Sequence, residues 1–574
     1  MHLNKADLSV ARAPAATHYC ITTNDGCFPA QGGRMALADA SRAFEAMGAG
    51  DNISSTEAEG PHGYMNRTRR GMYSLMQRVL QRRAKVDPSE DFSLMNHRIE
   101  MPHLIATPHG SVVQDLGSKT IFQLNLEWTK ANVARLNERR KSGAPFLEAL
   151  PSVARRISGY RSELPSAVKV SPLPEARFLG KITDVPGWVP GSSSWQERWI
   201  LQSEGRCGVG LQIHLPHVGP SVGDDAMESG TYPPSMKTTM AVLLSRSGSS
   251  PTDDTYSRDP YARELVSQAL NQGRGVVIVT LCGFGFLADP LPDHQNPGHF
   301  AKPFDAEFTP EGGDIAVFNG RSTPGFHAGE ITRAMRFVRS LPYVSGIRHI
   351  LSTGYTDSAL LHELVASPVP MQNATVTIVG GTTFESVASS ELYSSPPYIE
   401  VPGALAAGGY DLPDLMAAAL HRSAQTLKMQ LWNPTDTNGL RLSSAKAQQV
   451  YGMAVHGGAI VSVANVSVHE VVQRLLMPNG LGKNNISRLK TDDSTSSTAN
   501  GTPPNTSLAT MPIAYFGGHH TGTIHKDVPC SKVTGCRPKQ NIEMLAKMRL
   551  VMMYATPRLA HLLDPLSHAR PMSD

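Results

Sequence analysis

Apolar runs and helical periodicities alternate through the middle of the chain, from about residue 166 to 478. Four runs, AVLL, VVIVTL, TVTIV and AIVSV, are almost uninterrupted, which is typical of strands buried on both faces of a sheet. The pattern predicts strands at 199–201, 208–213, 239–244, 276–281, 349–351, 376–379, 429–432 and 460–463. It predicts helices at 261–270, 328–341, 358–365, 414–420 and 469–476. Such alternation indicates an α/β domain with a doubly wound, mostly parallel sheet.

The first 86 residues have a different order. A strand is predicted at 19–22, a turn at Asn24-Asp25-Gly26, a helix at 35–47, a loop at 60–63 and a helix at 72–80. No neighbouring strand is evident. We therefore expect this strand to pair with chain outside the segment or to dock elsewhere.

Three further segments complete the expected organisation. Residues 87–165 predict a mixed connector, with short strands at 104–106 and 111–113 followed by two charged helices whose apolar stripes lie at 133–136 and 146–153. Residues 479–511 contain TDDSTSSTANGTPPNTS and predict a flexible linker. Residues 512–574 offer one helix candidate, at 542–554, and no clear core.

Composition narrows the function classes. The 574 residues exceed one ordinary core, and 40% hydrophobic with 18% charged residues is typical of a globular protein. The net charge of +4 is spread without a basic block, so a nucleic-acid partner is not expected. No run is long enough for a membrane span or a signal peptide, and the compartment stays open. The six cysteines are widely scattered, so we expect buried thiols rather than a disulfide framework.

The chemistry of such a sheet is expected at the carboxyl ends of its strands. A serine hydrolase of this architecture carries its nucleophile on a sharp strand-to-helix turn, G-x-S-x-G. The corresponding turn here follows the strand at 349–351 and reads Ser352-Thr353-Gly354-Tyr355-Thr356. Gly354 therefore occupies the nucleophile position, and glycine cannot attack a carbonyl. Ser352 and Ser358 are nearby hydroxyls, which also suit a turn residue and a helix cap.

An acid and a histidine follow this turn in the order expected of a catalytic triad. Asp436 comes after the strand at 429–432, in Asn433-Pro434-Thr435-Asp436, and His469 is the nearest histidine after the last strand. Both residues have a structural alternative. Asp436 also suits a turn, and His469 also suits a helix start.

Other motifs have weaker support. Gly219-Pro220-Ser221-Val222-Gly223 matches G-x-S-x-G, but no apolar strand leads into it and no apolar helix follows. The glycines of Gly283-Phe284-Gly285 lack the spacing of a dinucleotide-binding loop. The tail's histidines and cysteines have no zinc-ligand spacing; they are His519, His520, His525, Cys530 and Cys536. We expect neither a metal nor a cofactor.

A longer ordered match lies within residues 17–477. The runs Val401-Pro402-Gly403-Ala404-Leu405, Tyr410 to Leu415 and Trp432 to Asp436, with the helix at 325–339, resemble large bacterial acetylxylan-esterase-like α/β-hydrolases. The resemblance implies an α/β-hydrolase-type domain at 166–478, preceded at 1–86 by the C-terminal piece of a second such unit. It also implies that Asp25 and His62 are the acid and base of that first unit, whose serine would lie upstream of Met1. A turn residue at Asp25 and a surface loop residue at His62 are the structural alternatives.

Three functions remain open at this stage. The chain is expected to be an esterase-type protein impaired in the 166–478 domain by Gly354. Alternatively, it is an active serine carboxyl-ester hydrolase that uses Asp25 and His62 with a serine outside the chain, or a non-catalytic carbohydrate- or protein-binding module. A peptidase is weaker still, because fold alone does not set the substrate. A small-molecule or carbohydrate ester is the expected substrate class, and the oligomeric state is open.

Overall fold

The computed structural model describes residues 5–25, 28, 30–82, 104–163, 176–183, 194–203, 208–216, 237–244, 259–282, 290–292, 300–303, 320–353, 356–391, 401–424, 426–464 and 466–477. The expected linker at 479–511 and tail at 512–574 lie outside these residues. No described helix combines the length and the apolar character needed to cross a bilayer.

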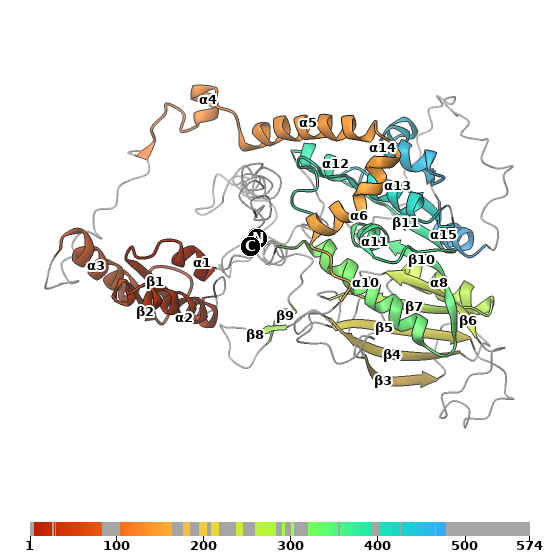
Figure 1. Ribbon diagram of the computed structural model, residues 1–574, viewed down its shortest axis with the longest axis horizontal. Coiled ribbons are helices and arrows are strands. Elements are labelled where there is room, and N and C mark those ends of the chain that lie inside the picture. Colours follow the sequence, from red (N-terminus) through yellow and green to blue (C-terminus); the bar gives the residue numbers. More distant parts are fainter. Residues whose placement is uncertain are drawn as a thin grey trace, which may run out of the picture.

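The N-terminal elements form a small parallel β-α-β unit with one further α-helix before it and one after it, on the left of Figure 1. The two strands pair in parallel, with Thr17 opposite Ile53 and Thr22 opposite Ala58. Alternate side chains of the first strand face different helices. Ile21 faces the helix at 30–46, because a Cβ added at Gly33 of that helix would lie 3.4 Å from the Ile21 side chain. Cys20 faces the helix at 66–80, because its thiol donates a hydrogen bond to the Thr68 carbonyl. The elements are α1 (Lys5–Val10), β1 (Thr17–Thr22), α2 (Ala30–Ala46), η1 (Gly50–Asn52), β2 (Ile53–Ala58) and α3 (Asn66–Leu80).

The expectation that the first strand has no neighbour within its own segment is therefore wrong. Its neighbour β2 reads ISSTEA, which has almost no apolar residue to signal a strand. The two helices expected in this segment are confirmed as α2 and α3.

The connector is helical throughout its described elements. Helix α4 (Val112–Leu116) begins at Ser111, whose hydroxyl accepts from the Gln114 amide, and ends at Gly117 in the left-handed region. The strands expected at 104–106 and 111–113 are wrong, because these caps place Val112 and Val113 in a helical turn and 104–106 forms no strand. The two long helices are confirmed as α5 (Ile121–Arg140) and α6 (Ala144–Ser158).

One nine-stranded sheet dominates the rest of the chain, in the order β13-β12-β11-β10-β6-β7-β5-β4-β3. The strands from β13 to β7 are parallel, and β5, β4 and β3 are antiparallel to their neighbours at one edge. Figure 1 shows this edge at the bottom of the large domain. The strands are β3 (Ala176–Thr183), β4 (Ser194–Gln202), β5 (Gly208–Pro216), β6 (Thr238–Leu244), β7 (Gly275–Thr280), β10 (Val344–Thr353), β11 (Thr375–Val379), β12 (Lys428–Trp432) and β13 (Ile460–Ser462). A separate pair joins β8 (Pro290–Pro292) to β9 (Phe300–Pro303).

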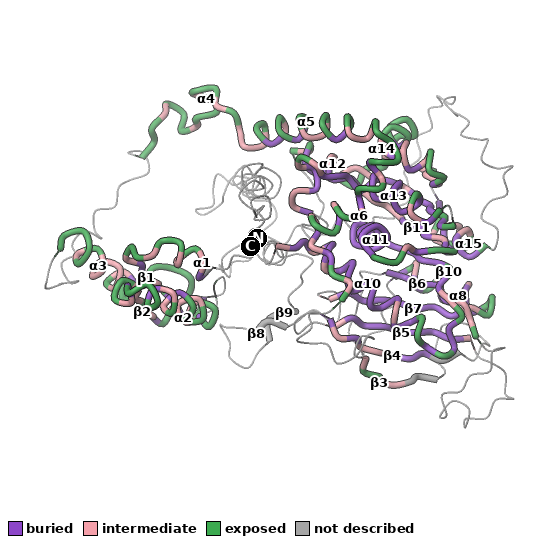
Figure 2. Tube along the Cα trace, in the orientation of Figure 1, coloured by how far each residue is buried: buried purple, intermediate pink, exposed green. Residues whose placement is uncertain are grey.

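Helices cover both faces of this sheet. Val277 and Val279 of β7 pack into the core that includes α6, α10, α11, α13 and α14, whereas Val276 and Ile278 pack into the core formed with α8 and α15. Figure 2 shows the central strands buried along their length. This alternation follows from the period of two in a strand. The helices are α8 (Pro260–Asn271), α10 (Thr323–Ser340), α11 (Asp357–Ala366), α12 (Phe384–Ser389), α13 (Leu412–Arg422), α14 (Ser444–His456) and α15 (Val468–Leu476).

The expected mostly parallel sheet with helices on both faces is confirmed for this region. Every strand and every helix predicted in this region lies within an observed element or extends at most one residue beyond it. The amphipathic or mostly polar elements β3, α12 and α14 were not predicted. Strand order places β6 and β10 side by side, with α8 and α11 leaving on opposite faces. In a sheet of this kind a binding site is expected at the carboxyl ends of two such strands.

Candidate functional site

Asp25 and His62 meet at the carboxyl ends of β1 and β2. The His62 Nδ1 lies 2.9 Å from the Asp25 Oδ2. An ionised carboxylate only accepts hydrogen bonds. In this contact the His62 Nδ1 therefore carries the hydrogen and donates a hydrogen bond to Asp25. The parallel register brings the two loops together, because Thr23 N bonds to the Ala58 carbonyl and Asn24 N to the Gly60 carbonyl.

Further donors hold the Asp25 carboxylate in place. The Thr22 hydroxyl donates to Oδ2 at 3.0 Å, and the Phe28 amide donates to Oδ1 at 2.9 Å. Asp25 is only 6% exposed. These hydrogen bonds fix the orientation of the carboxylate and favour its charged form.

His62 has a different environment. Its side chain is 57% exposed, and its ring lies 5.4 Å from the Phe28 ring between centroids. With Nδ1 committed to Asp25, the lone pair of the neutral ring is on Nε2. This is the arrangement in which an imidazole takes a proton from a nucleophile while a carboxylate orients it and stabilises the imidazolium.

The strand-turn-helix at the expected nucleophile position runs from β10 into α11. Gly354 lies outside the described residues. Ser352 is fully buried, and its hydroxyl shares a hydrogen bond of 2.7 Å with the Thr356 hydroxyl. Ser358 is fully buried inside the first turn of α11. Neither hydroxyl is accessible to a substrate.

Asp436 and His469 are not brought together by hydrogen bonds. The Asp436 carboxylate accepts the amides of Asn438 and Leu440 at 2.8 and 2.9 Å, which closes its own turn. His469 Nδ1 lies 2.7 Å from Glu264 Oε1 of α8, and its side chain is 64% exposed. These contacts match the structural alternative for each residue.

A polar cluster that the sequence analysis missed lies where β10, β11 and β12 end. It comprises Asp357, Thr382 and Asn433, which follow these three strands. A Cβ on Gly381 would lie 3.3 Å from the Asp357 Oδ2, so the loop after β11 runs directly beside this carboxylate. The sequence signal for this loop was the pair Gly380-Gly381 directly after a buried strand. Both glycines adopt a positive φ in the structure.

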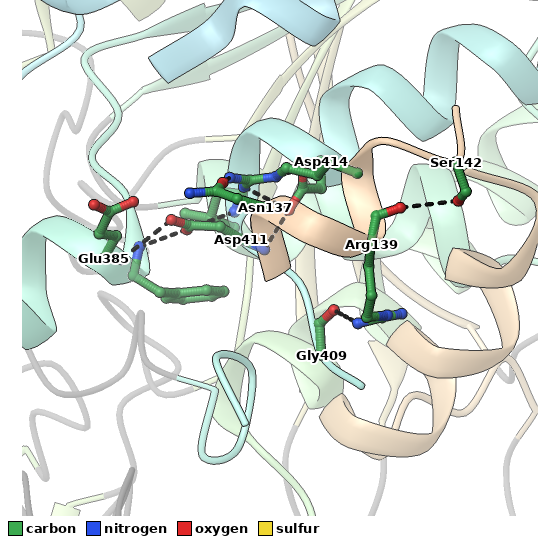
Figure 3. Close-up of polar contacts among 10 residues, drawn as sticks. Asn137, Arg139, Ser142, Glu385, Gly409, Asp411 and Asp414 are labelled. Atoms are coloured by element: carbon green, nitrogen blue, oxygen red, sulfur yellow. Dashed lines mark hydrogen bonds and ion pairs between the residues drawn. The ribbon is translucent and has the colours of Figure 1, made fainter. Parts of the chain in front are cut away.

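Asp411 anchors the same loop from the other side (Figure 3). Its Oδ1 accepts the Phe384 and Leu412 amides, both at 2.7 Å, and its Oδ2 accepts the Glu385 amide at 3.1 Å. One carboxylate thus caps the first turns of both α12 and α13. Asp414 in turn accepts both the Asp411 amide and the guanidinium of Arg140, which attaches α5 to the α/β domain.

The expectation of cysteine thiols is partly wrong. Cys282 is disulfide-bonded, and its partner lies outside the described residues. Its backbone is held at the end of β7 by Glu330, which accepts its amide, and by His327, whose Nε2 lies 3.0 Å from its carbonyl. Cys20 is a free thiol as expected, but it is exposed and not buried.

Several other expectations fall outside the described part of the chain, namely those on Gly219 to Gly223, Gly283 to Gly285 and the histidines and cysteines of 519–536. Within the described residues, no cluster of three or more His, Cys, Asp or Glu side chains could hold a metal ion.

No family model and no curated protein matches the sequence. Solved structures that resemble the fold include a Bacteroides fragilis protein provisionally described as an acetyl xylan esterase, at 13% identity over 61% of this chain and 81% of that chain, with a TM-score of 0.35. An acetyl xylan esterase from Paenibacillus sp. R4 is 14% identical over 54% and 85%, with a TM-score of 0.30. A glucuronoyl esterase from Solibacter usitatus is 13% identical over 53% and 79%, also with a TM-score of 0.30. Overlap at this level identifies neither a substrate nor a catalytic residue.

Proposed function

We propose that this chain supplies the acid and base of a serine carboxyl-ester hydrolase, with Asp25 as the acid and His62 as the base. The single observation that supports this is the 2.9 Å contact between Asp25 Oδ2 and His62 Nδ1 at the carboxyl ends of two parallel strands. A buried, multiply bonded carboxylate behind a half-exposed imidazole, placed at the carboxyl ends of parallel strands, is the arrangement of an acid and base in a serine hydrolase.

In the proposed mechanism, Asp25 holds the His62 ring with Nδ1 protonated. The Nε2 then takes the proton of a serine hydroxyl as that oxygen attacks the ester carbonyl. The same nitrogen returns the proton to the leaving alcohol. The serine comes from polypeptide outside the described residues, and carbohydrate esters are the proposed substrate class.

The 166–478 domain is proposed as a non-catalytic companion of the first unit. Three features support this role: Gly354 in the nucleophile position, the buried hydroxyls of Ser352 and Ser358, and the Glu264 contact of His469. In this arrangement the two units are tandem α/β-hydrolase-like modules, of which only the first performs chemistry.

The pair itself is tested by proton NMR of the full chain. An imidazole N–H bonded to a carboxylate gives a far-downfield resonance, and we expect one assigned to His62. Asp25→Asn should abolish it. Asp115→Asn is the matched control, because His109 Nδ1 lies 2.5 Å from Asp115 Oδ1 in a separate His-Asp pair. This variant should abolish the resonance of His109 and leave that of His62 unchanged.

The chemistry is tested by hydrolysis of p-nitrophenyl acetate and acetylated xylan. The relevant activity is the turnover that a serine-directed fluorophosphonate inhibits. His62→Ala should lower this turnover by roughly 100- to 10,000-fold. His469→Ala should leave it unchanged. Fluorophosphonate-sensitive turnover that survives His62→Ala would refute the proposed base.

A further inference from the structure

The carboxyl ends of β10, β11 and β12 lie side by side. Thr353 pairs with Val379, and Val379 pairs with Trp432, so the residues that follow these strands converge at one edge of the sheet. The connecting backbone is tightly held, since Gly380 N bonds to the Trp432 carbonyl and Thr435 N to the Gly381 carbonyl. This edge is where ligands bind in sheets of this type.

Two buried polar atoms at this edge have no hydrogen-bond partner among the described residues. The Thr382 hydroxyl is one, on a residue only 8% exposed, and the Asn433 Oδ1 is the other. A buried polar group without a partner is energetically unfavourable, because it has lost its hydrogen bonds to water. Asn433 is half-buried, so the cluster reaches the surface at this residue.

Asp357 provides an acceptor beside them. The residue is 8% exposed, and its carboxylate is bonded to the backbone at the start of α11, with no cationic side chain paired to it in the described part of the chain. Burial raises its pKa to about 6. The carboxylate fits here because position 381 has no side chain and adopts φ +97°.

The donor and acceptor types define the ligand. A carboxylate and an amide oxygen accept hydrogen bonds, and a hydroxyl both accepts and donates. The carboxylate disfavours an anionic ligand such as phosphate. A divalent cation takes several oxygen ligands and usually more than one carboxylate, whereas this cluster has one. Hydroxyl groups of a neutral molecule can donate to the carboxylate and to the amide oxygen, and they can donate to or accept from the threonine hydroxyl.

We infer that Asp357, Thr382 and Asn433 bind a polyhydroxylated ligand, through adjacent hydroxyls, at the carboxyl edge of the large sheet. This site belongs to the companion domain and does not depend on Asp25 or His62. It gives that domain a binding role of its own.

The test uses the full chain and ligand-observed NMR. D-xylose and D-galactose are the probes, and tetrahydropyran, a ring without hydroxyls, is the control ligand. Binding is compared in Thr382→Val, which removes only the hydroxyl donor, and in Asn433→Gly, which suits the positive φ of +53° at this position. Thr375→Val is the matched control at the opposite end of β11.

We expect saturation transfer to at least one sugar and none to tetrahydropyran. Each site variant should raise the dissociation constant about tenfold, as the loss of one ligand hydrogen bond predicts. Thr375→Val should leave it unchanged. Absence of transfer to both sugars, or equal affinity in all variants, would overturn the inference. So would a thermal shift caused by calcium alone that both site variants abolish, because the site would then bind a cation.

Discussion

Replacing Asp411 with alanine should destabilise the large domain more than a surface substitution can. The change removes the acceptor of three backbone amides, those of Leu412, Phe384 and Glu385. Loss of a helix N-cap costs about 1 kcal/mol. Each of the two α12 amides left without an acceptor adds about 1 to 2 kcal/mol. The free energy of unfolding should therefore fall by about 3 to 5 kcal/mol.

Asp411→Asn is the matched variant. Asparagine retains one oxygen that can accept the Leu412 and Phe384 amides, and it loses the acceptor for Glu385. We expect a loss of about 1 to 2 kcal/mol, clearly smaller than for alanine. The difference between the variants isolates the hydrogen bonds from the packing of the side chain, which is similar in size in Asp and Asn.

Urea unfolding followed by tryptophan fluorescence measures the loss, and amide hydrogen exchange locates it. Exchange at Phe384 and Glu385 should accelerate in Asp411→Ala, whereas exchange in the β1–β2 unit should not change. A shift of less than about 1 kcal/mol, or unchanged exchange at α12, would contradict the view that one carboxylate caps both helices.

Three further outcomes follow from the same contacts. Gly381→Ala should lower the unfolding free energy by about 1 to 2 kcal/mol, measured by thermal melting, because alanine is strained at positive φ and its Cβ would crowd Asp357; an unchanged melt would exclude that crowding. Burial raises the pKa of Glu363 to about 7, so the folded chain binds the extra proton and stability falls as pH rises from about 4.5 through about 7. Glu363→Gln should remove this loss, about 3 kcal/mol between pH 4 and pH 8 in urea titrations; parallel pH profiles would contradict it. Gly354→Ser should restore no hydrolysis of p-nitrophenyl acetate, since His469 is bonded to Glu264, and turnover gained on this change would show a hidden triad in the second unit.

Prediction from sequence succeeded where burial leaves a periodic trace. The strands around 239–244, 276–281 and 376–379 are apolar because both faces of the sheet are covered, and the stripe Ile331, Ala334, Met335 and Val338 is at most 1% exposed on α10. It failed where local capping or pairing outweighs composition. The run Ser111-Val112-Val113 is helical because Ser111 and Gly117 cap it, and ISSTEA is a strand because β1 supplies its partner.

The candidate sites divide in the same way. The strand-turn-helix pattern was enough to single out Gly354, and the resemblance to acetylxylan-esterase-like hydrolases implied Asp25 and His62, because the order of strand, acid and histidine can be read along the chain. Contacts between distant segments cannot be read from the sequence in this way. His62 lies 37 positions after Asp25, and only the parallel β1–β2 register brings the two together; His469 contacts a carboxylate on α8, 205 positions away in the sequence. Likewise, Asp357, Thr382 and Asn433 form a cluster only because three strands end side by side. Hydrophobic pattern sets which elements form, whereas sheet order and loop packing set which polar groups meet.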